Sequence, residues 1–309
     1  MIKSIHKKNN QGGNTNSEKL NILITRIGGG LGNQLFQYAV ARNIAILNNL
    51  NFRLDLSWFA NNNDRKYELS YFNIIENIAT DNEIKKLKKH KKKNSRRWFL
   101  YNYFLINESK YVEEKQFNFD PNIMKVKSSI YLDGYWQTEK YFKENKELIR
   151  KEFTLVNPLS INAKKIYSTI KSKRSVSLHI RRGDYITNKE ANRNMGICPI
   201  EYYKKAIQIV SQKISNPHFF IFSDDINWAK ENLKTHFPIT FVSDGKIPDY
   251  EELILMKECK HNIIANSSFS WWGAWLNNNT NKTVVAPKKW FNNKARNSSD
   301  ITPKSWIRM

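Results

Sequence analysis

After Pro158 the chain alternates short apolar runs with longer segments whose apolar residues recur at helical spacing. Strands are expected at 218–223, 240–242, 262–265 and, as the last one, 283–286, with a further strand leading into Arg181. Helices are expected between them, at about 158–173, 199–215, 226–237, 250–260 and 270–277. Strands that alternate with helices form a parallel sheet covered by helices, so this half predicts an α/β fold whose ligands bind beyond the carboxyl ends of the strands.

The first half begins with the same kind of unit. Residues 20–27 are predicted to form a strand, 28–34 a glycine-rich loop and 35–48 a helix. The chain has 309 residues, more than a typical single domain, so two domains with a boundary near Pro158 are expected. We predict a polar, disordered leader at 1–19, an amino-terminal domain at 20–157 and a carboxyl-terminal domain at 158–309.

Composition limits the partners and the compartment. The formal charge of +23 predicts an acidic partner: a nucleic acid, an anionic lipid surface or a phosphate-bearing substrate. A basic run at 85–97, followed by Trp-Phe-Leu at 98–100, forms either a solvated helix face or a patch that touches the inner face of the plasma membrane. The chain has no apolar run of about 18 residues and no apolar signal segment, so it is expected in the cytosol, with Cys198 and Cys259 reduced.

Two arginines, Arg181 and Arg182, follow an apolar strand, and Asp184 lies two residues further on. An arginine fork is permanently charged and binds phosphate oxygens through two N–H groups at once, so the pair is a candidate diphosphate site. His179 lies on the same face of the strand as Arg181. The competing interpretation is structural: the arginines form ion pairs with Asp184, and the histidine is a hydrogen-bonded strand residue.

Polar residues also follow two other predicted strands. Ser223, Asp224 and Asp225 end the strand at 218–223, where carboxylates accept hydrogen bonds from a ribose or from guanine. The run Asn-Ser-Ser-Phe at 266–269 comes directly before a predicted helix, whose unpaired N–H groups and positive dipole end suit a phosphate. Each group alone is also an ordinary helix cap. Three such groups at strand ends favour a binding site.

The glycine-rich loop differs from a dinucleotide-binding turn. Its glycines at 28–30 and 32 fit no phase of Gly-x-Gly-x-x-Gly, because Asn33 or Leu35 occupies the last position. Glycines still allow a tight turn or a close approach of the backbone to another group. Asn33 and Gln34 are expected to offer neutral hydrogen bonds to sugar hydroxyls.

Four blocks together resemble the bacterial α-1,2-fucosyltransferases of glycosyltransferase family 11. They are Gly-Gly-Leu-Gly-Asn-Gln-Leu-Phe-Gln-Tyr-Ala at 29–39, His-x-Arg-Arg-Gly-Asp at 179–184, Ser-Asp-Asp at 223–225 and Asn-Ser-Ser-Phe-Ser-Trp-Trp-Gly-Ala at 266–274. The resemblance implies a GT-B-like architecture of two Rossmann-like domains facing across a cleft. It also implies that the carboxyl-terminal domain holds GDP-fucose and the amino-terminal domain the acceptor.

The same resemblance implies the site residues and the reaction. It implies that Arg181 and Arg182 bind the diphosphate and that Ser223, Asp224 or Asp225 binds the guanosine. The loop on the phosphate side consists of Asn266, Ser267, Ser268 and Phe269. The loop that faces the sugar and the acceptor includes Gly29, Gly30, Gly32, Asn33 and Gln34. The implied reaction transfers L-fucose from GDP-β-L-fucose to the 2-hydroxyl of a terminal galactose-type sugar. The acceptor is an oligosaccharide or lipid-linked glycan for a surface polysaccharide such as the lipopolysaccharide O-antigen, and no cofactor is implied.

The expected reaction develops opposite charges on the sugar and on the leaving group. Breaking the bond between fucose C1 and phosphate leaves negative charge on GDP, which the arginines and the helix start stabilise. The chain contains no Asp-x-Asp pair, so we expect transfer without a metal ion. Attack from the opposite face inverts the donor linkage. Asp184 and His179 are the candidate bases, alongside their structural roles.

Two other functions fit part of the sequence. Another GDP-sugar-dependent GT-B transferase would use the same arginines and carboxylates. A nucleic-acid-binding protein would explain the charge but not three polar groups at strand ends, and its basic residues would gather in one binding module. We therefore expect a glycan partner and no nucleic acid. The segment at 64–136, which carries no motif, is expected to shape acceptor choice.

Overall fold

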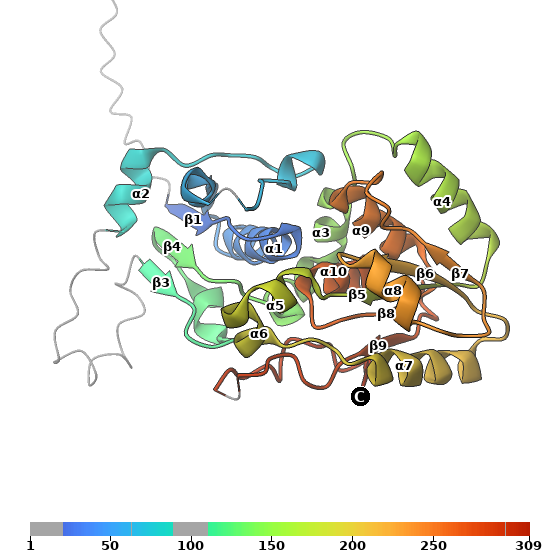
Figure 1. Ribbon diagram of the computed structural model, residues 1–309. Helices are drawn as coiled ribbons and strands as arrows, with labels where there is room; N and C mark the ends of the chain where they lie inside the picture. Colours follow the sequence, from blue (N-terminus) through green and yellow to red (C-terminus); the bar gives the residue numbers. More distant parts are fainter. Residues whose placement is uncertain (1–20, 63, 89–110, 294) are drawn as a thin grey trace, which may run out of the picture.

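The computed structural model of the protein describes residues 21–62, 64–88, 111–293 and 295–309 (Figure 1). The predicted leader at 1–19, the basic run from Lys89 onward and the segment at 98–100 lie outside the described residues. Two parallel sheets organise the described chain. No helix in the described ranges is long and apolar enough to cross a membrane.

The first sheet has four parallel strands in the order β2-β1-β4-β3. These strands are β1 (Ile22–Arg26), β2 (Asn51–Asp55), β3 (Tyr111–Glu113) and β4 (Ile130–Asp133). The helices of this part are α1 (Leu31–Leu47), α2 (Asp81–Lys88) and α3 (Lys146–Glu152). Short 3₁₀ turns lie at Ser57–Asn61, Leu69–Tyr71, Pro121–Lys125, Glu139–Tyr141 and Lys143–Asn145.

The second sheet has six parallel strands in the order β10-β9-β8-β5-β6-β7. Its strands are β5 (Ser175–Ile180), β6 (His218–Ser223), β7 (Ile239–Phe241), β8 (His261–Ile263), β9 (Val284–Ala286) and β10 (Ile307–Arg308). Its helices are α4 (Ile161–Ser172), α5 (Gly183–Thr187), α6 (Lys189–Met195), α7 (Ile200–Lys213), α8 (Ile226–Asn232), α9 (Asp249–Glu258) and α10 (Ser268–Leu276). The carboxyl ends of all six strands therefore face one edge.

Most elements expected after Pro158 are present near their predicted bounds, but two differ. Helix α8 ends at Asn232 and does not reach 237, because Pro238 disfavours a helical residue before it and the polar residues 234–236 give no apolar face to bury. The strand at 283–286 is not the last one. β10 follows it, and its two residues are too few to show a pattern.

The predicted loop at 28–34 is also partly wrong. Helix α1 begins at Leu31, so the second half of that segment is helical. Leu31 and Leu35 are four residues apart and both buried, so they form one apolar helix face. This burial outweighs the low helix propensity of Gly32.

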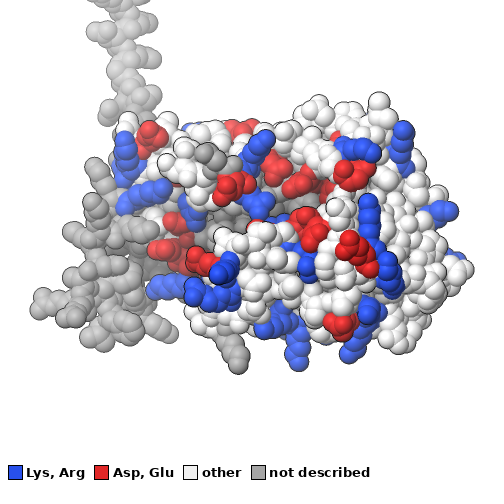
Figure 2. All heavy atoms as spheres, in the orientation of Figure 1, with Lys and Arg blue, Asp and Glu red and all other residues white. Residues whose placement is uncertain are grey.

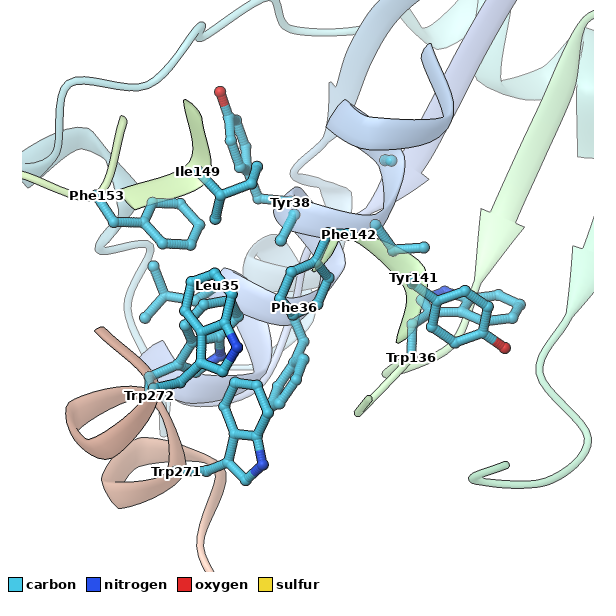
Figure 3. Packing of buried hydrophobic residues seen from close by; sticks show 14 of the residues in the cluster. Leu35, Phe36, Tyr38, Trp136, Tyr141, Phe142, Ile149, Phe153, Trp271 and Trp272 are labelled. Atoms are coloured by element: carbon cyan, nitrogen blue, oxygen red, sulfur yellow. The ribbon is translucent and has the colours of Figure 1, made fainter. Parts of the chain in front are cut away.

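Helices α1 and α10 pack together and join both sheets into one hydrophobic cluster (Figure 3). Trp271 and Trp272 of α10 are fully buried, with ring centroids 4.5 and 4.9 Å from that of Phe36 on α1. The indole nitrogen of Trp272 donates a 3.0 Å hydrogen bond to the carbonyl oxygen of Gly32. The first turn of α1 is thus fixed against α10. The predicted domain boundary at Pro158, between α3 and α4, stays a prediction, because this cluster includes residues from both sides of it.

Candidate active site

The three polar groups predicted after strands of the second sheet lie at one edge of it. β5 pairs with β6 on one side and with β8 on the other, so the residues that follow these strands are neighbours. The Tyr185 hydroxyl lies 3.5 Å from the Asn266 carbonyl oxygen, and the ring of His179 is 5.6 Å from that of Phe269. The three polar groups, which the sequence placed at the ends of predicted strands, therefore lie close together.

Arg181 is held between two carboxylates. Its Nη2 atom lies 2.7 Å from Asp184 Oδ1, and its Nη1 atom lies 3.0 Å from Asp224 Oδ2. Its guanidinium carbon is also 5.3 Å from the centre of the Tyr185 ring. The ion-pair interpretation of this arginine is thus realised, at the place where a ligand is expected. Figure 2 shows acidic and basic side chains interspersed over the middle of the drawn face.

Arg182 has a different setting. Its Nε atom lies 3.2 Å from Asp225 Oδ2, and its guanidinium carbon lies 3.8 Å from the centre of the Trp228 ring. Asp225 also caps α8, since its Oδ1 accepts a hydrogen bond from the Trp228 N–H. Asp224 Oδ1 accepts one from the Arg182 N–H. All four oxygens of the two aspartates therefore already have partners, which leaves only their second lone pairs for guanosine.

Sequence reasoning missed Glu252, a carboxyl group at the same edge. Glu252 lies on α9 and accepts a 2.9 Å hydrogen bond from the Ser243 hydroxyl, which accepts one from the Ser223 N–H. Burial is the main cause that raises the pKa of Glu252 to about 8. The residue reads as one more helical glutamate, so the sequence gives no signal for it.

The side chain of Asn266 forms hydrogen bonds within the surrounding loops. Its side-chain nitrogen donates to three carbonyl oxygens, those of Met195, Gly196 and Trp290, at 3.0 to 3.1 Å. Its side-chain oxygen faces the Cys198 thiol at 3.5 Å. The expected ligand contact by its amide therefore finds no unused donor.

The starts of α1 and α10 meet at this edge. Ser267 occupies the N-cap position of α10 and Gly30 that of α1, and no side-chain hydrogen bond caps either helix. The Ser268 hydroxyl donates a 2.9 Å hydrogen bond to Asn33 Oδ1 and so ties the two first turns together. Two helix starts without side-chain caps, each with unpaired N–H groups and a positive dipole end, therefore lie next to each other. The arrangement suits an anion.

Within the glycine loop only some residues face open space. Gly29 has a φ of +77°, a conformation that favours glycine, and Gly30 has no atom within 4 Å of the position that a Cβ would take. Gln34 is fully buried, and its amide bonds the Gly29 and Lys66 carbonyl oxygens and the Glu68 N–H. In the structure the Gln34 amide shapes the loop, and its contact with sugar hydroxyls stays a prediction.

The turn after β4 also contacts the first turn of α1. Gln137 donates a 2.8 Å hydrogen bond to Asn33 Oδ1, and Trp136 has a φ of +57°, an uncommon conformation for its residue type. Glu114 fixes this turn by accepting the N–H groups of Tyr135 at 2.7 Å and Trp136 at 3.0 Å. Burial raises the pKa of Glu114 to about 7. Strained backbone of this kind is concentrated at binding sites.

His179, a candidate base, is buried in β5. Desolvation, with a smaller effect of the Arg181 charge, lowers its pKa to about 3. Its Nδ1 atom has no hydrogen-bond partner among the described residues. An imidazole with such a pKa is neutral and a weak base near pH 7, so the structure does not favour a base role.

Sequence reasoning also missed Arg65, which follows the 3₁₀ turn at Ser57–Asn61. Its Nη2 atom lies 3.1 Å from Asp184 Oδ2. No cluster of three His, Cys, Asp or Glu side chains that could hold a metal ion is present in the described part of the chain.

Comparison with known proteins identifies the family. The family model of Glycosyl transferase family 11 matches residues 19–309. An alpha-1,2-colitosyltransferase of Escherichia coli is 35% identical over 304 residues, which are 94% of this chain and 99% of the relative. The O-antigen biosynthesis glycosyltransferase WbnK of Escherichia coli is 36% identical over 301 residues, which are 92% of this chain and 99% of the relative.

More distant proteins match in part or in fold. Galactoside alpha-(1,2)-fucosyltransferase 1 of Homo sapiens is 27% identical over 154 residues, which are 47% of this chain and 42% of the relative. The fucosyltransferase NodZ from Bradyrhizobium shares the fold, with a TM-score of 0.50 and 12% identity over 82% of this chain and 93% of that chain. The predicted GT-B architecture is confirmed. With a family model that spans nearly its whole length, the protein belongs to glycosyl transferase family 11.

Proposed function

We propose that the protein transfers L-fucose from GDP-β-L-fucose to the 2-hydroxyl of a terminal galactose-type sugar, with inversion and without a metal ion. The observation that carries this proposal is the meeting of two helix starts without side-chain caps, those of α1 and α10, at the end of β5, where the ring of His179 lies 5.6 Å from that of Phe269. Glycosyl transfer from a nucleotide sugar needs such a place for the departing diphosphate.

The donor diphosphate occupies this edge in our proposal. Helix N–H groups and Arg181 stabilise the negative charge that develops as the C1–O bond breaks. Asp184 and Asp224 hold the Arg181 fork in position before the donor arrives. The fucosyl unit then faces Gly30, Asn33 and the turn after β4, where the acceptor approaches from the first sheet.

Asp184 orients arginines in this proposal and does not act as a strong base. Its two oxygens each pair with a guanidinium, Arg181 at 2.7 Å and Arg65 at 3.1 Å. Both carboxylate oxygens are thus engaged with arginines, as expected of a residue that positions them. A loose transition state, in which the C1–phosphate bond is largely broken before attack, requires little base assistance.

The family relatives support the sugar type but leave two donors open. The Homo sapiens relative is named a galactoside alpha-(1,2)-fucosyltransferase, and the Escherichia coli relative an alpha-1,2-colitosyltransferase. Colitose is fucose without its 3-hydroxyl group. GDP-colitose is therefore our second candidate donor, favoured by the similarity over 94% of this chain.

Donor turnover decides between these candidates. We expect release of GDP from GDP-fucose in the presence of a β-galactoside, with GDP-colitose at least tenfold slower and GDP-mannose inactive. A site that hydrogen-bonds a 3-hydroxyl discriminates strongly against the deoxy sugar. Preference for GDP-colitose would change the assignment to colitosyl transfer. If the protein turned over neither GDP-fucose nor GDP-colitose, the proposal would be overturned.

Metal independence and the acceptor have separate tests. Activity should persist after chelator treatment and desalting, and a strict requirement for a divalent ion would contradict the mechanism. For the acceptor we propose a lipid-linked O-antigen glycan, supported by the O-antigen relative. Nuclear magnetic resonance of the product should show an α-linked fucose at the galactose 2-position, whereas a β-linked product would exclude inversion.

A further inference from the structure

We propose that Arg65 is a third guanidinium for the donor diphosphate, contributed by the part of the chain that builds the first sheet. The inference rests on the proposed GDP-sugar function. It differs from the predicted site, in which the arginines come from 181 and 182 alone. The donor site then spans both sheets.

The first support is the shared carboxylate. Asp184 Oδ2 lies 3.1 Å from Arg65 Nη2, and Asp184 Oδ1 lies 2.7 Å from Arg181 Nη2. One carboxylate thus bridges guanidiniums from two distant segments of the chain, 119 residues apart for Arg65 and Asp184. A group that meets Arg181 at this edge is within reach of Arg65 as well, since both forks bind the two oxygens of one small carboxylate.

The second support is the anchoring of the Arg65 backbone. The buried amide of Gln34 donates to the Lys66 carbonyl oxygen at 2.8 Å and accepts the Glu68 N–H at 3.0 Å. Further along, Tyr71 stacks on Tyr250 of α9 with 3.9 Å between ring centres. The segment is held by helices α1 and α9, so less conformational entropy is lost when Arg65 binds a ligand.

The third support is availability. The side chain of Arg65 is 37% exposed, against 20% for Arg181 and 14% for Arg182. Arg181 already directs Nη1 and Nη2 at two different aspartates, whereas Arg65 directs Nη2 at one. Among the three guanidiniums, Arg65 therefore has the most surface to offer an incoming anion.

Charge balance explains why an additional arginine matters. Three arginines (65, 181 and 182) face three aspartates (184, 224 and 225), so their formal charges cancel. A diphosphate that replaces a carboxylate partner on one of these arginines gains a charge-assisted hydrogen bond without leaving that guanidinium unpaired. The half-exposed pair between Arg65 and Asp184 costs least to open, because exposed ion pairs contribute little. The diphosphate takes the place of Asp184 on Arg65, and Asp184 stays with Arg181.

Calorimetric titration of GDP and of guanosine tests the assignment. Arg65→Ala should weaken GDP binding about tenfold and change guanosine binding less than twofold. Arg174→Ala is the matched control: Arg174 is an exposed arginine at the amino end of β5, away from the site, and should leave both affinities unchanged. If Arg65→Ala bound GDP as tightly as the wild type, the proposal would be overturned. If the alanine variant is too unstable to titrate, Arg65→Gln is used instead, with the same criterion.

A second background separates phosphate binding from a structural ion pair. In Asp184→Asn the pair with Arg65 is weakened beforehand, so a purely structural Arg65 would show no further loss of GDP affinity on Arg65→Ala. A phosphate contact predicts a loss of about tenfold there too. If the wild-type protein bound no GDP at all, the proposed function itself would be overturned. If the wild type bound GDP and the Arg65 variants bound it equally well, only this inference would be overturned.

Discussion

Gly32, in the first turn of α1, touches the backbone of Phe269 in the first turn of α10: a Cβ atom on Gly32 would lie 2.4 Å from the Phe269 nitrogen. It would also lie 2.5 Å from the Ser268 carbonyl carbon. Both neighbours are backbone atoms, which cannot move aside like the end of a side chain. The close approach of the two helix starts, on which our anion site depends, therefore requires glycine at this position.

Gly32→Ala should lower the free energy of unfolding by about 2 kcal/mol or more and reduce turnover strongly. Alanine normally gains up to about 1 kcal/mol over glycine inside a helix, but overpacking costs roughly 1–3 kcal/mol, and here the colliding atoms are backbone. Denaturant unfolding and donor turnover measure both effects.

The same change two residues earlier is the control. At Gly30 no atom lies within 4 Å of the added Cβ, and φ is −73°, which alanine adopts readily. The free energy of unfolding of Gly30→Ala should stay within about 1 kcal/mol of the wild type. Equal stability of both variants would contradict the helix contact.

Arg181→Ala should lower turnover more than tenfold while the melting temperature changes little. The loss is large because the variant lacks the charge that is proposed to stabilise the departing diphosphate, and Asp184 and Asp224 each lose one partner. Single-turnover kinetics with GDP-fucose measures the effect, and circular dichroism checks the fold. A near-normal rate would refute the role of Arg181.

That the candidate site residues lie close together was predictable, because parallel strands bring their carboxyl ends to one edge whatever the conformation of the loops. Arg181, Asp224 and the run at 266–269 could therefore be grouped because each follows a predicted strand. What each group does there was not predictable. Asp225 and Asn266 are largely consumed by local hydrogen bonds, and those depend on loop conformations that periodicity does not encode.

Residues from distant segments escaped prediction for a related reason. Arg65 reaches Asp184 across 119 positions, and its segment contains no motif, so only tertiary packing shows the contact. Gln34 was predicted to bind a sugar because an amide in a glycine loop suits hydroxyls. In the structure its buried amide bonds the Lys66 carbonyl oxygen and the Glu68 N–H. Side-chain orientation decides such cases.

Glu252→Gln should stabilise the protein more as pH rises. In the wild type the buried Glu252 has a pKa of about 8, above its ordinary value of 4.5, mainly through desolvation. The folded state therefore binds more protons than the unfolded state between these values, and wild-type stability falls as pH rises from about 4.5 to about 8. Glutamine keeps an acceptor for Ser243 and does not ionise.

The measurement is the difference in melting temperature between Glu252→Gln and wild type. It should be about 3 °C or more at pH 8.5 and smaller at pH 5.5, since each kcal/mol shifts the midpoint of a protein of this size by about 2–4 °C. Glu258→Gln, an α9 carboxylate paired with Lys171 on the surface, is the control and should show no such trend. A pH-independent difference would mean that Glu252 is ionised in the folded state like an ordinary glutamate.

His179→Gln should make the protein less sensitive to acid and leave transfer within about tenfold of wild type. Burial, with Arg181 nearby, lowers the pKa of His179 to about 3, below its ordinary value of 6.5. Between these values the unfolded state binds the extra proton, so wild-type stability falls as pH drops from about 6.5 toward 3. Glutamine removes that linkage, and the variant should gain in melting temperature relative to wild type at pH 4.5 compared with pH 7.5. General base catalysis contributes roughly 100-fold or more, so a turnover loss of that size, with the fold intact, would instead identify His179 as the base.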